Sequence, residues 1–310
     1  MKARRFPLAD RGFRILVVAC GSLVLAVLAL ITVSMTSEAM PAFRHQGLGF
    51  VTSNDWNPPA QRFGALAFVY GTVVSSAVAL ALAVPVSIGI ALFLSELAPV
   101  RLRRPVSYVV DLLAAVPSVV FGLWGILVLA PFVKHPYAGL SSNLGGLPIV
   151  GPLFGGQPSG KSMFTGGIIL ALMITPIITS ITREVFDTVP RGQKEAAYAL
   201  GATRWEMVRG AILPHGRAGV VGAVMLGLGR AMGETIALAL VLGSIPRISA
   251  HLFTPADAMP AVIANQFGEA SGLYRSALIG LGVVLFAVTI LVNLVARVVV
   301  HRASAGEASA

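Results

Sequence analysis

The sequence predicts an all-α, polytopic membrane protein with six transmembrane helices. Of its 310 residues, 56% are hydrophobic and only 12% are charged, whereas a soluble domain usually carries about 25% charged residues. Apolar stretches long enough to cross a bilayer core, which needs about 20 helical residues, recur six times along the chain. We expect the spans near residues 15–36, 66–94, 107–131, 164–182, 218–243 and 276–299.

The first predicted span follows a basic segment, residues 1–14, and contains the single cysteine, Cys20. In a lipoprotein, the apolar region of the signal peptide would precede this cysteine. Here apolar sequence begins only at Ile15 and continues well past Cys20. We therefore expect Cys20 inside the first helix. The six helices make one domain, residues 15–300, followed by a short tail, residues 301–310.

The second, third and fourth predicted spans each contain a proline, at Pro85, Pro117 and Pro176. A membrane helix tolerates an internal proline where neighbouring helices satisfy the freed carbonyl. The segments near residues 37–65, 132–163 and 244–275 are rich in Gly, Pro, Ser and Asn. These segments are expected to form ordered surface loops rather than domains.

Basic residues predict the orientation. The formal net charge is +10, which can indicate nucleic-acid binding. Here the lysines and arginines lie beside the apolar runs, which favours contact with membrane lipid and no nucleic-acid partner. Sixteen of them fall in the N-terminal segment, the tail and the loops 95–106 and 183–217, against six on the opposite side. The positive-inside rule then places both termini in the cytoplasm.

The second of these cytoplasmic loops predicts a helix, a tight turn and a second helix. Pro190 suits the start of a helix over residues 191–200. Gly201 suits the C-terminal cap of that helix, where a left-handed backbone favours glycine. Thr203 and Glu206 have the spacing of a capping box, which begins the next helix.

The second helix of the loop is expected to run to Leu213 and to stop at Pro214. Its apolar residues, together with those of the first helix, would leave an apolar surface on the cytoplasmic side. The residues of this surface are Ala196, Ala197, Leu200, Trp205, Val208 and Ile212. Such a surface fits either a protein partner or a helix that lies on lipid.

The loop resembles the EAA loop of bacterial ABC importer permeases. That pattern is Glu-Ala-Ala, three residues, Gly, nine residues, Ile, one residue, Leu-Pro. This chain matches it at Glu195, Ala196, Ala197, Gly201, Leu213 and Pro214. Ala211 stands where the family often has Ile, a small departure. Small alanines allow close approach and the glycine turns the chain sharply, so the pattern suits docking onto an ATPase.

Three further motifs resemble the phosphate-importer branch of that family, the PstC type. AAVPSVVFGLWG at 114–125, TPIITSITREVF at 175–186 and GLGRAMGET at 227–235 are similar to its third, fourth and fifth helices. The resemblance spans roughly residues 65 to 300 and implies the type I ABC importer permease fold. It implies a permease subunit of an ATP-driven inorganic phosphate importer in the bacterial cytoplasmic (inner) membrane, with no catalytic centre and no cofactor of its own.

The same resemblance implies three protein partners. They are a second permease of the PstA type, a cytoplasmic ATPase dimer of the PstB type and an extracytoplasmic phosphate-binding protein of the PstS type. A permease for another oxyanion, such as sulfate or molybdate, or for amino acids would share the EAA loop, although the helix motifs disfavour it. A stand-alone secondary anion carrier would be expected to show internal repeats, which are not evident. An enzyme acting on lipid phosphates would need clustered acidic or histidine residues, which the sequence lacks.

Two charged residues, Arg230 and Glu234, are predicted near the middle of the fifth span. A charge at the bilayer centre costs several kcal/mol, so it should face the interior and have a partner. The spacing of four places both on one helix face. They form either a structural ion pair or an anion site in the substrate pathway, where the guanidinium matches phosphate oxygens. The family associates this pair with phosphate transport. Asp111, near the cytoplasmic end of the third span, is expected to have a structural role.

Residues 155–162, GGQPSGKS, fit the P-loop pattern G-x-x-x-x-G-K-[ST]. Lys161 is nevertheless predicted outside the cell, Pro158 removes an amide from the presumed cradle, and no acidic-ended apolar strand follows. We therefore expect an outer loop that leads into the fourth helix and binds no nucleotide. The five histidines are scattered without metal-ligand spacing, so no metal site is expected.

Overall fold

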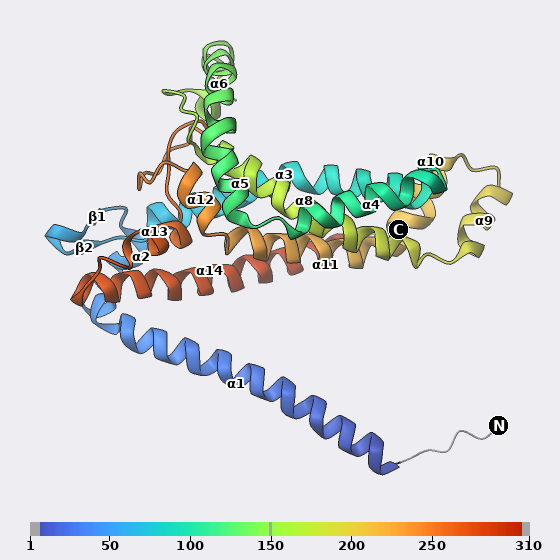
Figure 1. Cartoon of the computed structure of the whole chain (residues 1–310), viewed down its shortest axis with the longest axis horizontal. Coiled ribbons are helices and arrows are strands. Elements are labelled where there is room, and N and C mark those ends of the chain that lie inside the picture. Colours follow the sequence, from blue (N-terminus) through green and yellow to red (C-terminus); the bar gives the residue numbers. More distant parts are fainter. Residues whose placement is uncertain (1–6, 149–150, 306–310) are drawn as a thin grey trace.

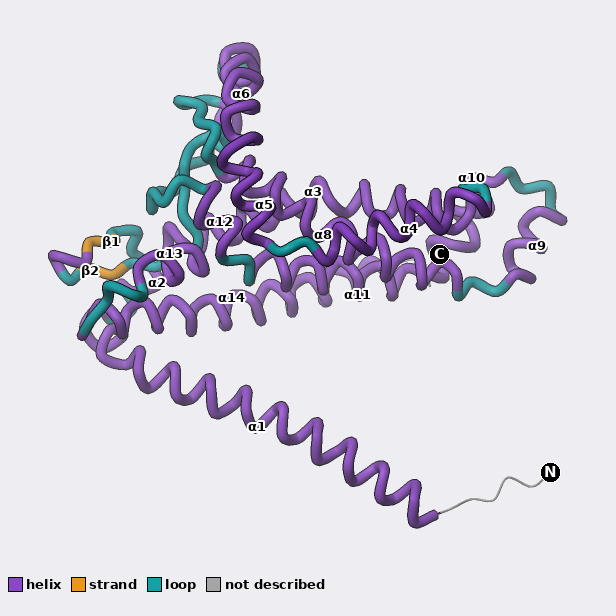
Figure 2. The backbone as a smooth tube through the Cα atoms, in the orientation of Figure 1, coloured by secondary structure: helices purple, strands orange, loops and turns teal. Residues whose placement is uncertain are grey.

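The computed structural model describes residues 7–148 and 151–305. Within this part of the chain, six helical segments are long and apolar enough to cross a membrane, which confirms the predicted number of spans. They cover Arg11–Gln46, Leu66–Leu97, Ser118–Leu144, Met163–Asp187, Arg204–Met232 and Gly272–Val298. Figure 2 shows that helices dominate the whole fold.

The elements follow one another in a simple order. They are α1 Pro7–Gln46, α2 Gly49–Thr52, β1 Trp56–Asn57, η1 Pro58–Ala60, β2 Arg62–Phe63, α3 Leu66–Leu92, η2 Phe93–Leu97, α4 Val100–Ala115, α5 Ser118–Trp124, η3 Gly125–Leu129, α6 Ala130–Leu144, α7 Gly151–Phe154, α8 Met163–Asp187, α9 Arg191–Ala199, α10 Arg204–Met207, η4 Val208–Ile212, α11 Leu213–Met232, α12 Ile236–Val241, α13 Met259–Gln266 and α14 Gly272–Ala305. Of the η segments, η1 is a 3-10 helix and the other three are π-helical.

Helices α3, α8 and α11 form the centre of the bundle, and α8 packs against both of the others. Ile174 and Ile178 of α8 are fully buried here, together with Ala79 of α3 and Ala223 of α11. A Cβ atom on Gly227 of α11 would lie only 2.8 Å from Cδ1 of Ile178. Small residues at these contacts let the helix backbones approach closely, which is how helices associate in lipid.

Helix α1 diverges from the rest of the bundle (Figure 1). The C-terminal part of α1 packs against α14, and Ala39 and Ala42 of α1 are buried there. Farther toward its start, large apolar side chains such as Leu30 are 69% exposed. Figure 1 also shows that the start of α1, the end of α14 and helices α9 and α10 lie at one end of the long axis, and the β1–β2 hairpin at the other.

The third span differs from the prediction. The helix expected over residues 107–131 is divided into α4 and α5, and the apolar span continues through η3 and α6 to Leu144. Pro117 causes the division, because a proline disfavours helical backbone in the residue before it. Val116 is accordingly extended, with φ −66° and ψ 127°. Part of the segment expected as an outer loop is therefore helical.

The fifth span also differs from the prediction. The helix does not stop at Pro214 but runs without interruption from Arg204 to Met232. It then breaks over residues 233–235 before the short helix α12, so the single helix expected over 218–243 does not form.

Each of the three π-helical segments ends two residues before a proline, at Pro99, Pro131 and Pro214. In a π turn, an N–H donates to the carbonyl five residues back, as Ala98 does to Phe93 at 2.7 Å. Proline offers no N–H, and its ring collides with the carbonyl four residues back in a regular α-helix. The wider π turn accommodates the ring, and this explains why Pro214 does not end the helix.

The hairpin is fixed to the bundle by aromatic side chains. β1 pairs with β2 through Trp56 and Phe63. The ring of Trp56 meets those of Phe63 and Phe68 edge-on, with centroids 5.3 and 5.0 Å apart. Its Nε1–H donates to Oε1 of Gln266 in α13 at 3.2 Å. This part of the segment expected as a loop near 37–65 is therefore ordered.

Candidate functional site

The segment that joins α8 to α11 folds around a glycine turn, as the sequence predicts. Gly201 has a φ of +80°, a backbone conformation that glycine adopts without strain. Its N–H donates to the carbonyl of Tyr198 at 2.9 Å, and the N–H of Ala202 donates to the carbonyl of Ala197 at 3.1 Å. These two bonds form a Schellman motif, which ends α9.

The predicted capping box is also present. The hydroxyl of Thr203 accepts from the backbone N–H of Glu206 at 3.3 Å, and Oε2 of Glu206 accepts from the N–H of Thr203 at 2.7 Å. No neighbouring atom lies within 4 Å of the space that a Cβ on Gly201 would fill. The glycine turn itself is therefore held by local hydrogen bonds and not by side chains packed around Gly201.

The α9–α10 segment exposes large apolar side chains. Leu200 is 89% exposed, Trp205 63% and Tyr198 46%. The prediction that Val208 and Ile212 belong to the same surface is wrong. Both are buried in a cluster with residues of α3 and α8, because they lie on the helix face turned toward the bundle. The matched loop residues are divided: Glu195, Ala196, Gly201 and Pro214 are exposed, and Ala197 and Leu213 are half-buried.

An ion pair holds α9 to the end of the second span. Nζ of Lys194 lies 2.5 Å from Oε1 of Glu96 in η2, and the two side chains are 20% and 12% exposed. Sequence reasoning missed this contact because 98 positions separate the two residues and no local spacing relates them. We therefore predict that the pair sets the angle at which α9 leaves the bundle.

Breaking this pair should weaken the link between α9 and the bundle. We expect Glu96→Gln to reduce transport by about fivefold, or about 1 kcal/mol, between the values of exposed and buried pairs. The double variant Glu96→Gln/Lys194→Gln should recover only the part of the loss that comes from the unpaired charge of Lys194, because the link between α9 and η2 remains broken. Asp55→Asn is the control, because it breaks the exposed Arg62–Asp55 pair at 3.3 Å. Equal transport by Glu96→Gln and Asp55→Asn would show that the pair does not position α9.

Arg230 and Glu234 do not share a helix. Arg230 lies in the last turn of α11 with an exposed side chain. Glu234 follows the helix break and is 7% exposed. Its Oε1 accepts from the N–H of Ala237 at 3.4 Å, at the start of α12. In the described ranges no salt bridge joins Arg230 to Glu234. The predicted pair on one helix face is wrong, because α11 ends at Met232.

Arg230 does lie on an exposed strip of α11. Ala218, Gly222 and Leu226 precede it at steps of four residues, and all four positions are exposed. Steps of four follow one face of a helix. Helix α11 therefore presents a strip of small and apolar residues, ending in a guanidinium, to whatever packs beside this chain.

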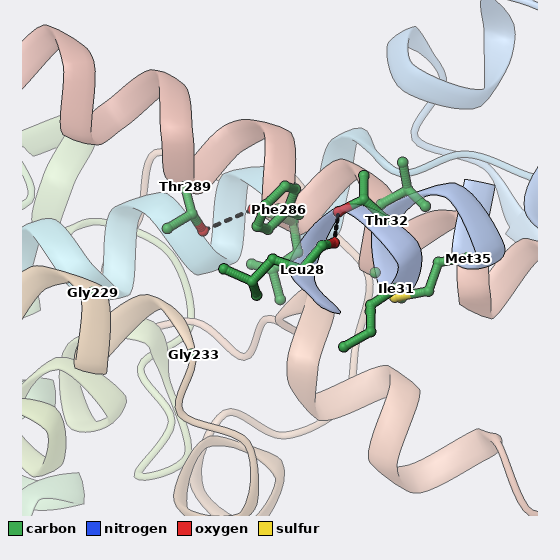
Figure 3. A pocket seen from close by; sticks show the side chains of 11 residues that line it. Leu28, Ile31, Thr32, Met35, Gly229, Gly233, Phe286 and Thr289 are labelled. Atoms are coloured by element: carbon green, nitrogen blue, oxygen red, sulfur yellow. Dashed lines mark hydrogen bonds between the residues drawn. The ribbon is translucent and has the colours of Figure 1, made fainter. Parts of the chain in front are cut away.

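Another side of α11 borders an apolar cavity of about 410 Å³. Figure 3 shows Gly229 of α11 and Gly233, the residue after its end, beside this cavity, with Leu28, Ile31, Thr32 and Met35 of α1 and Phe286 and Thr289 of α14 around it. The hydroxyls of Thr32 and Thr289 donate to carbonyls of their own helices. The cavity lining contains no charged side chain, so it offers no site for an anion.

The P-loop-like residues 155–162 connect α7 to α8, without the strand that precedes a P-loop. Ser162 is fully buried, and its hydroxyl accepts from the N–H of Thr165, which caps α8. The hydroxyl of Thr165 donates to the carbonyl of Gly160 at 2.7 Å and lies 3.0 Å from that of Tyr137. The hydrogen bonds of these polar groups stabilise the N-terminal end of α8, where the fourth span begins.

Lys161 offers a test of the orientation. It is exposed at the end of α8 that lies opposite α9, whereas the neighbouring Ser162 is buried and would not react. In a Cys20→Ser background, Lys161→Cys should react with a membrane-impermeant thiol reagent added outside the cell. Gln193→Cys, exposed on α9, should react only after permeabilisation. Reaction of both cysteines from the same side would contradict the topology.

Comparisons with known proteins agree with these observations. The family model of the binding-protein-dependent transport system inner membrane component matches residues 83–305. The phosphate transport system permease protein PstC of Mesorhizobium japonicum is 47% identical over 304 residues, covering 97% of this chain and 93% of that protein. PstC of Xylella fastidiosa is 46% identical over 96% of this chain and 93% of that protein. PstC 2 of Mycobacterium tuberculosis is 44% identical over 94% and 91%.

Solved structures show the same fold. A bacterial alginate ABC transporter, in complex with an alginate pentasaccharide-bound periplasmic protein, aligns with a TM-score of 0.63 over 97% of this chain and 99% of that one, at 17% identity. An inward-facing MetNI methionine ABC transporter aligns with a TM-score of 0.53 over 78% and 94%, at 20% identity.

Proposed function

Since this chain belongs to the binding-protein-dependent transport system inner membrane components, and within them to the PstC phosphate permeases, we propose that it forms half of the translocation pathway of an ATP-driven phosphate importer. It is a multi-pass transporter subunit of the bacterial inner membrane. The observation that carries the proposal is the exposed, glycine-turned α9–α10 segment in a chain 47% identical to a PstC protein.

The α9–α10 segment is the proposed dock for the ATPase. Leu200 and Trp205 expose large apolar surfaces beside the small Ala196, and exposed apolar patches mark sites of protein contact. The capping box and the Schellman motif fix the orientation of α9 relative to α10. Because α10 is continuous with α11, a movement of the α9–α10 segment would also move α11. The ATPase is a dimer of the PstB type on the cytoplasmic side, where both termini also lie.

The exposed strip of α11 is the proposed wall of the substrate pathway. A second permease of the PstA type packs beside this chain, and Arg230 faces the space between them. Its guanidinium compensates the charge of the passing phosphate, which would otherwise be costly in a medium of low dielectric constant. Oε1 of Glu234 accepts from the N–H of Ala237 in the first turn of α12, and this bond stabilises the helix break beside Arg230. A phosphate-binding protein of the PstS type delivers the anion at the hairpin end.

A permease for sulfate or molybdate is the second candidate, because the fold itself does not choose between oxyanions. The names of the relatives, at 44–47% identity, favour phosphate. A secondary anion carrier would not need the exposed α9–α10 segment.

The partners are tested by purification from solubilised membranes. A tagged form of this chain should bring down a second permease, an ATPase with a genuine P-loop and, in the presence of phosphate, an extracytoplasmic binding protein. Recovery of this chain alone, under conditions where it remains monodisperse, would overturn the proposal.

A further inference from the structure

A cavity of about 290 Å³, lined by Leu94 and seven polar or charged residues, lies between α4 and the end of α8 that precedes α9. Three guanidinium groups line it, from Arg103 and Arg104 of α4 and from Arg183 of α8. The side chains of Ser107 and Tyr108 add hydroxyl groups. Neither the strip on α11 nor the α9–α10 segment involves these residues.

Two of the guanidiniums are fixed by hydrogen bonds within the chain. Nε and Nη2 of Arg103 donate to the carbonyls of Ala98 at 3.1 Å and Ser95 at 2.7 Å. Pro99 cannot bond the carbonyl of Ser95, so Arg103 satisfies it instead. Nη1 of Arg183 donates to the hydroxyl of Ser107 and so joins α8 to α4. Each guanidinium carries five N–H donors, and these bonds use only one or two of them.

The three guanidinium groups that line the cavity form no ion pair with a described residue. Asp111 and Asp187 also line it, yet in the described parts of the chain neither carboxylate lies within 4.0 Å of an arginine nitrogen. Three guanidiniums against two carboxylates leave an excess of positive charge. The side chain of Arg104 is exposed and makes no hydrogen bond to a described residue.

We propose that this cavity binds a phosphate group. Guanidinium groups bind phosphate oxygens through pairs of hydrogen bonds, and arginines from two helices can grip one group from both sides. The group belongs either to an anionic phospholipid or to inorganic phosphate. The apolar surface beside the cavity favours the lipid. Val109 and Leu112, which follow along α4, are 63% and 68% exposed and would contact the acyl chains of the lipid. Basic pockets beside the cytoplasmic ends of transmembrane helices bind such headgroups.

The test measures binding rather than transport, and the comparison of wild type with a variant of the cavity separates this site from the proposed phosphate pathway. The assembled transporter is purified in detergent, and native mass spectrometry follows the addition of phosphatidylglycerol or, as a zwitterionic comparison, phosphatidylcholine. A second arm measures equilibrium binding of radiolabelled inorganic phosphate without lipid. Arg104→Gln is the main variant, because an exposed side chain can change without unfolding the helix. Arg101→Gln, on the same helix but outside the cavity, is the matched control.

We expect Arg104→Gln to lower the affinity for phosphatidylglycerol by about tenfold, the effect of one charge-assisted hydrogen bond. Arg101→Gln should stay within about twofold, as expected for a solvated charge. An effect of Arg104→Gln on inorganic phosphate alone would assign the site to the free ion. Equal binding of both ligands by the wild type and Arg104→Gln, or equal binding of the two lipids together with no binding of inorganic phosphate, would overturn the proposal.

Discussion

Arg230→Gln is expected to reduce ATP-dependent phosphate uptake by about a hundredfold, which corresponds to about 2.7 kcal/mol. The substitution keeps the length of the side chain and some hydrogen bonding but removes the positive charge that would compensate the anion. Because the side chain is exposed on α11 and has no salt bridge in the described residues, the complex should assemble normally. The measurement is labelled-phosphate uptake, divided by the amount of complex in the membrane. Arg101→Gln should retain full uptake.

A double variant separates a substrate contact from a structural pair. If Arg230 and Glu234 stabilised each other, Arg230→Gln/Glu234→Gln would remove both charges and restore much of the uptake, since a neutral pair often costs little. The helix break separates the two residues, so we expect the double variant to remain as inactive as Arg230→Gln. Restored uptake would contradict the role of Arg230 in the pathway.

Gly201→Val is expected to reduce transport and substrate-stimulated ATP hydrolysis together, by about tenfold or more. A β-branched side chain is strongly disfavoured at a φ of +80°, so the turn between α9 and α10 must change. The space around Gly201 is open and the turn lies outside the bundle, so the protein should still insert in the membrane.

Gly192→Val is the matched control for this variant. Gly192 is also exposed in open space, but it lies inside α9 with an ordinary helical backbone. Valine should therefore leave the helix intact and change hydrolysis far less. If the Gly201→Val complex hydrolysed ATP at the wild-type rate, the α9–α10 segment would not be the ATPase dock.

The structural features that were predicted correctly from the sequence depend on residues close together in the chain. Membrane crossing follows from apolar length, so the six spans could be counted without a structure. The turn at Gly201 and the capping box at Thr203 follow from residues within one turn of each other, and both are present. The coarse site, an exposed segment between the fourth and fifth spans, follows from the same local patterns.

The features that sequence missed depend on packing between distant segments. Apolar length does not say whether a proline kinks a helix or divides it, so the extended backbone at Val116 and the continuous helix through Pro214 were both unexpected. The burial of Val208 depends on α3 and α8, which supply the other side of its cluster. The spacing of Arg230 and Glu234 places them on one face only if the helix continues, and it ends between them.

Phosphate import by this chain can be measured as uptake of labelled phosphate into proteoliposomes that contain the chain and its co-purified partners. We expect uptake only when ATP is supplied on the ATPase side of the membrane and the binding protein on the other side. Excess unlabelled phosphate should abolish it, and equal concentrations of sulfate or molybdate should not. Uptake that proceeds without ATP, or that sulfate or molybdate suppresses as strongly as phosphate does, would show that the chain is not part of an ATP-driven, phosphate-selective importer.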